Sequence, residues 1–227
     1  MLQGAPCVVF DLDGTLADTS ADLLAAANAC FAQMGAGAPL GAADRLTAFH
    51  GGRAMLRLGF SRLGERVEEE TVNRWYPELL KAYDAAIAVH TRPYEGAVDA
   101  VEALRQAGYA VTICTNKPEA LAEKLLAELG LRSLFGGLIG ADTLPTRKPD
   151  QAPYIASVAR AGGDLSRSML IGDTETDLLT ARAVGRPVAL VTFGPEGQGI
   201  ERLAPDHLLH HFEELPDLAA RVLGAAI

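Results

Sequence analysis

Short runs of apolar and β-branched residues alternate with longer amphipathic stretches along much of the chain. The runs predict six β-strands, at residues 7–10, 109–114, 138–140, 168–171, 188–192 and 207–210. Strands that alternate with helices in this way are typical of a parallel sheet with helices packed on its faces. We therefore predict an α/β fold, with a Rossmann-like parallel sheet as its core and helices on both faces of the sheet.

Turn-forming residues mark the ends of the helices expected between these strands. Gly108 ends a helix predicted over residues 95–107. Pro118 opens the next helix in its first turn, and that helix stops at Gly130. A third helix is predicted over residues 175–184.

The segment between the first and the second predicted strand has no convincing strand of its own. An ordinary connection between a strand and a helix has about 2 to 6 residues, so a segment this long must contain further structure. Alanine and leucine dominate its first part, and residues 67–88 predict a helix broken near Pro77. We predict a helical cap domain of residues 18–90, inserted into a core of residues 1–17 and 91–227.

The net charge of the chain argues against two classes of binding partner, nucleic acids and membranes. The chain of 227 residues carries 29 acidic and 20 basic residues, for a formal charge of −9, and its basic residues are interleaved with acidic ones. Such a surface repels nucleic-acid phosphates and anionic membranes, so we expect no nucleic-acid and no membrane partner. The first residues do not resemble a secretion signal, and no apolar run is long enough to span a bilayer, so a cytoplasmic protein is expected.

Three cysteines, Cys7, Cys30 and Cys114, lie far apart in the sequence. An odd number at this spacing predicts neither a disulfide framework nor a zinc site. Two of them, Cys7 and Cys114, lie within predicted strands, where we expect buried, unreactive thiols.

Polar residues follow three of the predicted strands directly. In the order of the strands they are Asp11 and Asp13, then Thr115 and Asn116, then Asp173 and Asp177. In open parallel sheets, ligands bind beyond the carboxyl ends of the strands. We therefore expect these side chains to meet in one place, although they are far apart in the sequence.

Four carboxylates in one place disfavour joint ionisation unless a cation lies among them. Oxygen ligands beside a phosphate group favour Mg²⁺. Lys148, in the loop after the strand at residues 138–140, can supply an organic cation. Thr115 and Asn116 precede a helix start and offer hydrogen-bond donors to phosphate oxygens. Together these groups match the needs of phosphoryl transfer, which are positioning and neutralisation of charge.

Asp11 and Asp13 can divide the chemistry between them. One carboxylate attacks phosphorus, and the other protonates the leaving oxygen and later activates a water molecule. Gly14 lets the chain turn just after the strand, which allows both carboxylates to reach one pocket.

Four segments together resemble the motifs of the haloacid dehalogenase-like hydrolase superfamily. More narrowly, the chain resembles its phosphoglycolate phosphatase branch, which has a helical cap after the first motif. The segments read DLDGTL at residues 11–16, ICTNKP at residues 113–118, KP at residues 148–149 and IGDTETD at residues 171–177. They occur in the family's order, and the resemblance extends over nearly the whole chain.

The resemblance implies a role for each matching residue. Asp11 would be the nucleophile and Asp13 the general acid and base. The phosphate would be bound by Thr115, Asn116 and Lys148. Mg²⁺ would be held by Asp11, the backbone carbonyl of Asp13, and Asp173, with Asp177 as a supporting acid. The implied reaction is Mg²⁺-dependent hydrolysis of a small phosphorylated metabolite through an aspartyl-phosphate, with 2-phosphoglycolate as the expected substrate.

Alternative functions stay open at this stage. Within the superfamily they are another sugar-phosphate phosphatase, a phosphomutase, a carbon–halogen hydrolase, for which Asp13 is not needed, and a phosphonate-cleaving enzyme. The last would need a Schiff-base lysine in the cap, where Lys81 is the only lysine. A different class is a catalytically idle phosphate-ligand binder, which would have no use for an acid and base at Asp13.

Several residues have two interpretations. Arg53, behind a pair of glycines in the cap segment, is either a contact for a substrate anion or a solvated side chain. Lys117 is either a surface residue at a helix start or a phosphate contact. Asp177 either faces the site or stabilises the dipole of its helix. The sequence is compatible with a monomer or a homodimer.

Overall fold

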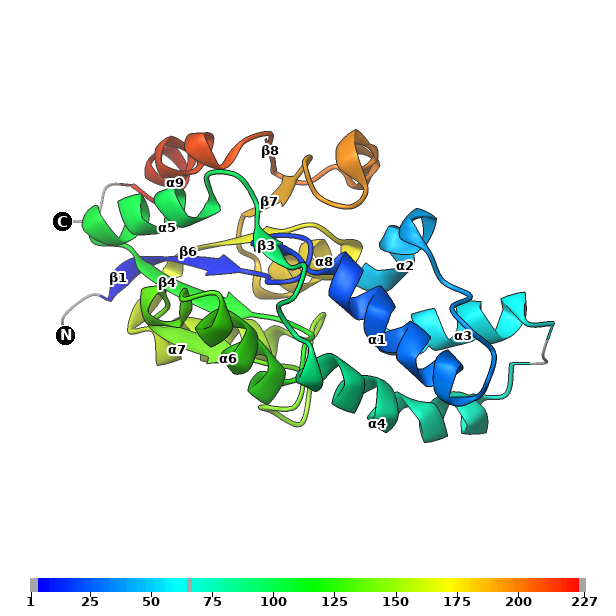
Figure 1. The fold of residues 1–227 in the computed structure, drawn as a ribbon. Helices are drawn as coiled ribbons and strands as arrows, with labels where there is room; N and C mark the ends of the chain where they lie inside the picture. The colour runs from blue at the N-terminus through cyan, green and yellow to red at the C-terminus, as the bar shows by residue number, and fades with distance from the viewer. Residues whose placement is uncertain (1–3, 65–66, 225–227) are drawn as a thin grey trace. The chain divides into compact units, whose positions relative to one another are not determined.

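The computed structural model describes residues 4–64 and 67–224. Its core is a six-stranded sheet in which every neighbouring pair of strands is parallel (Figure 1). In spatial order the strands are β5 (Gly137–Ile139), β4 (Ala110–Cys114), β1 (Ala5–Phe10), β6 (Gly163–Gly172), β7 (Val188–Val191) and β8 (His207–Leu209). The predicted α/β fold with a parallel sheet is confirmed.

The first strand, β1, lies in the middle of the sheet, between β4 and β6. Its residues from Cys7 to Phe10 are fully buried, as expected for a strand covered on both faces. The last residue, Phe10, lies opposite Ile113 of β4 and Ile171 of β6. This register brings the carboxyl ends of the three strands to the same edge of the sheet.

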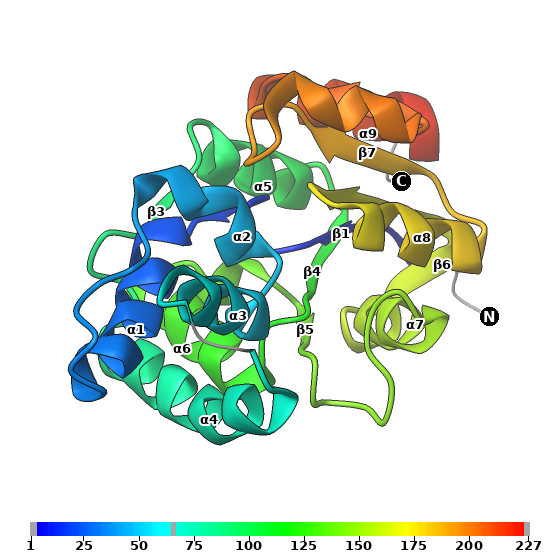
Figure 2. The same cartoon turned by 90° about the vertical axis from the view of Figure 1, so that its right-hand side faces the viewer.

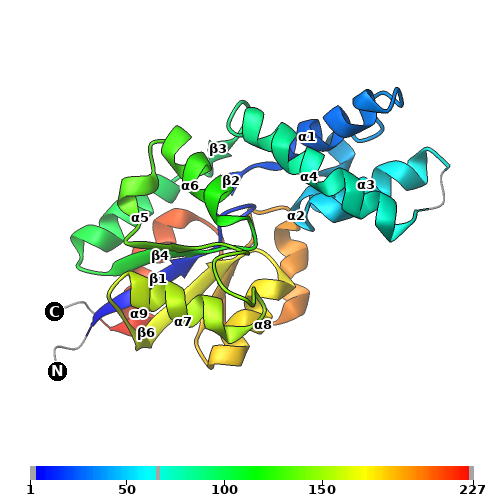
Figure 3. The ribbon, with the colours of Figure 1, turned by 90° about the horizontal axis from the view of Figure 1, so that it is seen from below.

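Helices cover both faces of the sheet. They are α5 (Ala97–Gln106), α6 (Glu119–Glu128), α7 (Gln151–Arg160), α8 (Glu175–Val184) and α9 (Leu215–Leu223), with short 3₁₀ turns η2 (Arg132–Leu134), η3 (Gly197–Leu203) and η4 (Phe212–Glu214). Helices α5 and α9 pack against each other on one face (Figure 2). Helices α7 and α8 lie side by side on the other face (Figure 3).

The chain separates into two compact units, Met1–Ala17 with Pro93–Ile227, and Asp18–Arg92. The second unit contains α1 (Ser20–Gln33), η1 (Ala42–Asp44), α2 (Arg45–Phe49), α3 (Gly52–Arg62) and α4 (Glu69–Ala85). The chain enters and leaves this unit through β2 (Ala17–Asp18) and β3 (Arg92–Pro93), which pair with each other. The sequence places the second boundary after residue 90, whereas the structure divides after residue 92.

Helix α4 continues through Pro77, although the sequence predicts a break there. Proline removes one helical hydrogen bond, which disfavours a helix interior. The buried residues Val72, Leu79 and Tyr83 share one face of α4, and the helix packs with α1 and α3. Burial of this face outweighs the missing hydrogen bond, so the helix stays continuous.

Two core elements differ from the sequence-based expectation. Strand β6 is longer than residues 168–171, because Gly163 and Asp164 also pair with the beginning of β1. Helix α7 is not among the elements that the pattern predicts. Asp150 caps it by accepting a hydrogen bond from the backbone of Ala152 at 2.8 Å.

All three cysteines are buried free thiols, as predicted for Cys7 and Cys114. Burial raises the pKa of both Cys7 and Cys114 to about 12, which keeps these thiols protonated and unreactive at neutral pH. None of the helices in the described part of the chain is long and apolar enough to cross a membrane.

Candidate active site

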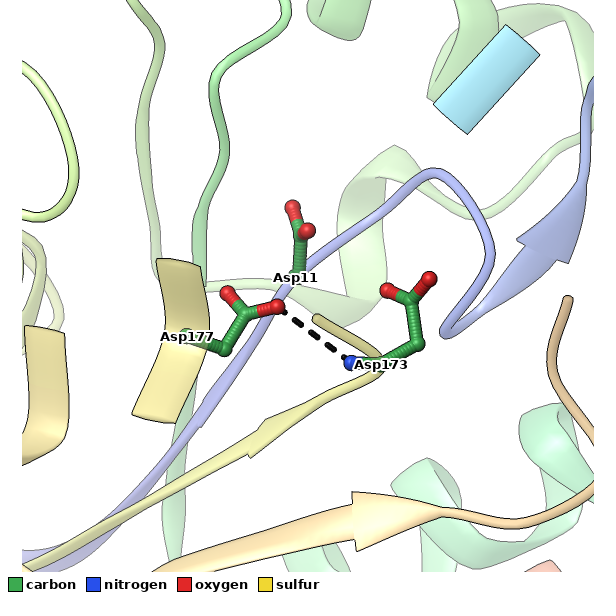
Figure 4. A group of neighbouring side chains, drawn as sticks. All are labelled: Asp11, Asp173 and Asp177. Carbon is green, nitrogen blue, oxygen red and sulfur yellow. Dashed lines mark hydrogen bonds between the residues drawn. The ribbon is translucent and has the colours of Figure 1, made fainter. Parts of the chain in front are cut away.

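The carboxyl ends of β1, β4 and β6 bring the predicted site residues together at the centre of the sheet edge. Asp11 follows β1, Thr115 follows β4, and Asp173 follows β6. Asp177 joins them from the first turn of α8. Figure 4 shows the carboxyl groups of Asp11, Asp173 and Asp177 gathered around one space, and one oxygen from each lies within 4.8 Å of the others.

Asp11 is a buried carboxylate beside a buried lysine. Its Oδ1 accepts a hydrogen bond from the backbone of Leu12 at 2.7 Å and lies 3.1 Å from the ammonium of Lys148. Burial raises the pKa of Asp11 to about 6, against the lowering effect of Lys148. The neighbouring charges of Asp177 and Asp13 contribute to this raised pKa. A bound dication would act in the opposite direction and favour the ionised carboxylate.

Lys148 lies between the carboxylates of Asp11 and Asp177. Its side chain is 2% exposed, and its ammonium donates to Oδ1 of Asp177 at 2.6 Å as well as contacting Asp11. Burial alone would lower the pKa of Lys148, but the charges of Asp11 and Asp177 more than offset this and raise it. Lys148 is therefore a permanent cation between two carboxylates.

Asp177 is oriented by the start of its own helix. Its Oδ2 accepts from the hydroxyl of Thr174 at 2.6 Å and from the backbone N–H groups of Thr174 and Asp173 at 3.1 and 3.3 Å. A side chain at Gly172 would place its Cβ 2.4 Å from Cβ and Cγ of Asp177, so only glycine fits there. With Lys148 on Oδ1, these contacts occupy both oxygens, and Asp177 faces the site.

Asp173 has one oxygen prepared for a ligand. Its Oδ1 accepts from the hydroxyl of Thr15 at 2.7 Å, whereas its buried Oδ2 has no hydrogen-bond partner among the described residues. Burial raises the pKa of Asp173 well above its usual range, and the charges of Asp177 and Asp11 raise it further. An unpartnered buried carboxylate oxygen is costly unless a cation binds it.

The side chains at this edge of the sheet carry an excess of negative charge that a divalent cation could neutralise. Four carboxylates, those of Asp11, Asp13, Asp173 and Asp177, face two ammonium groups, those of Lys148 and Lys117. A dication would balance the remaining two negative charges. The oxygen donors and the unpartnered Oδ2 of Asp173 therefore fit a hard metal ion.

The carboxylate of Asp13 lies outside the three-aspartate group and is paired with Lys117. The Lys117 ammonium contacts both oxygens of Asp13, at 2.8 and 2.9 Å. Gly14 has a φ of 83°, a conformation that only glycine adopts without strain, and it turns the chain directly after Asp13. Lys117 is 6% exposed, so its interpretation as a surface residue is wrong.

Thr115 and Asn116 stand beside the cluster with different surroundings. Thr115 is buried, and its Oγ1 accepts from the backbone of Lys117 at 3.2 Å, which leaves its hydroxyl hydrogen available to a phosphate oxygen. The side-chain amide of Asn116 donates to the backbone carbonyl of Lys148 at 3.1 Å. Asn116 thereby ties the loop that carries Lys148 to the end of β4.

Two residues of the second unit have contacts within that unit. The guanidinium of Arg53 stacks over the ring of Tyr76, 4.0 Å from its centre, and donates to Oδ1 of Asn73 at 2.6 Å. The side chain of Lys81 is 77% exposed, and its ammonium lies 3.3 Å from Glu78. A Schiff-base lysine needs a desolvated setting, which this exposed position does not provide. The role of Arg53 in substrate selection stays a prediction.

The comparison with protein families decides the assignment of the chain. The model of the haloacid dehalogenase-like hydrolase family matches residues 5–185, which include the strands and loops of the cluster. The chain belongs to this family of hydrolases.

Named relatives of the hydrolase agree in sequence and in fold. Phosphoglycolate phosphatase from Mesorhizobium japonicum is 37% identical over 97% of this chain and 98% of its own length. Phosphoglycolate phosphatase from Caulobacter vibrioides is 39% identical over 98% of this chain and 93% of its own length. The crystal structure of a predicted phosphoglycolate phosphatase from Haemophilus somnus shares the fold, with a TM-score of 0.82, 22% identity and coverage of 96% and 99% of the two chains.

Sequence reasoning about the hydrolase missed two contacts of the cluster. Thr15 belongs to the first motif, but its bond to Asp173 joins residues 158 positions apart. The pair of Lys117 and Asp13 joins residues 104 positions apart. The available signal for Lys117 was its place directly after Thr115 and Asn116, at the end of a central strand.

Replacement of Asp173 with asparagine tests whether the cluster binds metal, without any activity measurement. The wild-type hydrolase is expected to melt about 5 to 10 °C higher when Mg²⁺ is added at roughly 100 times its dissociation constant. The Asp173→Asn variant is expected to lose this shift. Its melting temperature in EDTA should be equal or higher, because one of several repelling carboxylates is gone. Thermal unfolding with Mg²⁺ and with EDTA gives both values.

The matched control is Asp99→Asn, because Asp99 is an exposed acid in the first turn of α5. This variant should keep the full Mg²⁺-dependent shift. An Asp173→Asn protein that melts with an undiminished shift would show that the ion binds elsewhere.

Proposed function

We propose that this hydrolase is a Mg²⁺-dependent phosphatase that converts 2-phosphoglycolate to glycolate and phosphate through an aspartyl-phosphate on Asp11. The observation that carries the proposal is the setting of Asp11, a buried carboxylate held by Lys148 beside the unpartnered oxygen of Asp173. The names of the relatives with 37 and 39% identity support the choice of substrate.

In the first chemical step, Asp11 would supply the nucleophilic oxygen. As this oxygen bonds to phosphorus, the bond from phosphorus to the glycolate oxygen breaks, and that oxygen takes a proton from Asp13. Lys148 would offset negative charge on the phosphoryl oxygens while holding Asp11 in place. Thr115 would donate its hydroxyl hydrogen to one of these oxygens.

In the second step, water would cleave the acyl phosphate. Asp13, now ionised, takes a proton from the attacking water, whose oxygen bonds to phosphorus as the bond to Asp11 breaks. Phosphate leaves, Asp11 is again a free carboxylate, and Asp13 carries the proton needed for the next cycle.

Mg²⁺ would be held by Asp11, the backbone carbonyl of Asp13, and Asp173. When bound, it would neutralise charge on the phosphoryl group and allow the neighbouring carboxylates to stay ionised. Asp177 would act as a supporting acid, because its two oxygens are already occupied by Lys148 and by the start of α8.

A phosphate-release assay over a panel of metabolites tests the proposal. The panel contains 2-phosphoglycolate, several sugar phosphates and p-nitrophenyl phosphate, each with Mg²⁺ and with EDTA. We expect the highest kcat/KM for 2-phosphoglycolate and no release in EDTA. A higher value for a sugar phosphate would change the proposed substrate, and isomerisation of a sugar phosphate without release would indicate a phosphomutase.

Absence of phosphate release from every compound would overturn the proposal and favour a phosphate-ligand binder. The proposed setting is the cytoplasm, with a small phosphorylated metabolite as substrate and the protein acting as a monomer or a homodimer.

A further inference from the structure

Lys117 is a buried cation that the roles described so far do not use. Its side chain is 3% exposed, and a buried ammonium is costly unless it is well paired. Its backbone is fixed at two points: its N–H donates to Oγ1 of Thr115 at 3.2 Å, and its carbonyl accepts from the N–H of Ala141 at 2.9 Å. The ends of β4 and β5 therefore anchor the base of this side chain.

The ammonium of Lys117 donates hydrogen bonds to both carboxylate oxygens of Asp13. The two contacts are 2.8 and 2.9 Å long, which is typical of strong charge-assisted hydrogen bonds. The side chain of Asp13 is 21% exposed, so packing alone leaves it room to rotate. A two-point contact with an anchored lysine removes that freedom.

The two lysines of the site serve different aspartates. Lys148 contacts Asp11, which would be the nucleophile, and Asp177. Lys117 contacts Asp13, the group assigned to the leaving oxygen and the attacking water. A group that transfers a proton must lie within about 2.6 to 3.2 Å of its target, and a displacement of about 1 Å can lower the rate roughly 100-fold.

We propose that Lys117 is a positioning residue for the leaving-group step. It donates to lone pairs on both oxygens of Asp13, which a protonated carboxyl group also keeps, and so directs the O–H of Asp13 toward the departing oxygen. This inference rests on the proposed function, because it takes the role of Asp13 from there. In this proposal Lys117 does not contact the metal. Lys117 positions Asp13, whereas Lys148 compensates the charges of Asp11 and Asp177.

The proposal makes the effect of Lys117 depend on the leaving group. Departure of glycolate creates an alkoxide that needs a proton, whereas p-nitrophenolate is a stable anion that needs little help. We expect Lys117→Met to lower kcat/KM about 100-fold for 2-phosphoglycolate and less than about 5-fold for p-nitrophenyl phosphate. Lys117→Arg, which keeps the charge and can still contact both oxygens, should recover most of the lost rate.

A double-mutant cycle with Asp13→Asn shows whether Lys117 acts through Asp13. The double variant Asp13→Asn with Lys117→Met should be no slower than Asp13→Asn alone, because the group that Lys117 positions is already absent. The Mg²⁺-dependent melting shift of Lys117→Met should be at least as large as that of the wild type, because the site loses one positive charge, and such a shift shows that the fold and the metal site are intact. Lys81→Met, at the exposed lysine of the cap, is the matched control.

Equal losses for both substrates, additive losses in the double variant, or full activity of Lys117→Met would each overturn the inference. These outcomes leave the proposed function standing as long as Asp13→Asn is itself slow on 2-phosphoglycolate. Full activity of Asp13→Asn would instead remove the assigned acid and base, and with it the inference about Lys117.

Discussion

Replacement of Asp11 with asparagine is expected to lower kcat for phosphate release by at least about 10⁴-fold, because an amide oxygen is a poor nucleophile toward phosphorus. The variant should fold normally. Asparagine has nearly the same shape, its Oδ1 can still accept from the backbone of Leu12, and Lys148 keeps its bond to Asp177. Loss of one buried carboxylate also relieves repulsion within the cluster.

Two measurements check this result. The first is steady-state phosphate release from 2-phosphoglycolate with Mg²⁺. The second is acid quenching during turnover, which should trap about one phosphoryl group per chain in the wild type and none in Asp11→Asn. Asp99→Asn, on the exposed side of α5, should resemble the wild type in both. Substantial turnover by Asp11→Asn would rule out Asp11 as the nucleophile.

Replacement of Lys148 with methionine is expected to impair both stability and activity. The side chain is 2% exposed, and its removal leaves Asp11 and Asp177 buried without their cation. Breaking a buried ion pair in this way typically costs about 3 to 5 kcal/mol of unfolding free energy. Loss of a charged group beside the phosphoryl oxygens should also lower kcat about 1000-fold or more.

The stability loss of Lys148→Met should depend on pH. The pKa of Asp11 is already raised to about 6 with Lys148 present, and without the lysine it should rise further. A carboxyl group with a raised pKa in the folded state destabilises that state as pH increases through the pKa, and protonation at lower pH removes the effect. The variant should therefore be closer to the wild type at about pH 5.5 than at about pH 8.

Denaturant unfolding in EDTA at the two pH values measures this difference. Lys81→Met is the control, because the side chain of Lys81 is 77% exposed and its loss should leave stability and activity unchanged. A Lys148→Met protein as stable as the wild type at both pH values would contradict the description of Lys148 as the cation that compensates Asp11 and Asp177.

The sequence predicted those elements whose local residues alone determine the structure. The run from Cys7 to Phe10 predicts β1, because a strand buried on both faces must be apolar throughout. Helix α8 is predicted at its observed bounds, since Gly185 has the left-handed conformation, with a φ of 67°, that commonly ends a helix. The motif aspartates follow such strands, so their meeting at one edge of the sheet could also be expected.

The remaining features depend on contacts that no local pattern records. The beginning of β6 is partly exposed and mixed in polarity, and it is a strand because its backbone pairs with β1. Pro77 favours a break in α4, and only packing of that helix within its unit keeps it continuous. The partner of Lys117 is 104 residues away, so its burial becomes visible only in three dimensions.

The central place of β1 has a consequence for the nascent protein. This strand leaves the ribosome well before its partners β4 and β6, which begin only at residues 110 and 163. At a synthesis rate of about 5 to 20 residues per second, the apolar side chains and unpaired backbone groups of β1 remain without a neighbouring strand on each side for on the order of ten seconds. The Asp18–Arg92 unit is continuous in sequence and can form during that interval. The active site therefore assembles late in synthesis. A chain truncated before β6 would lack the site and would expose β1 as an aggregation-prone strand.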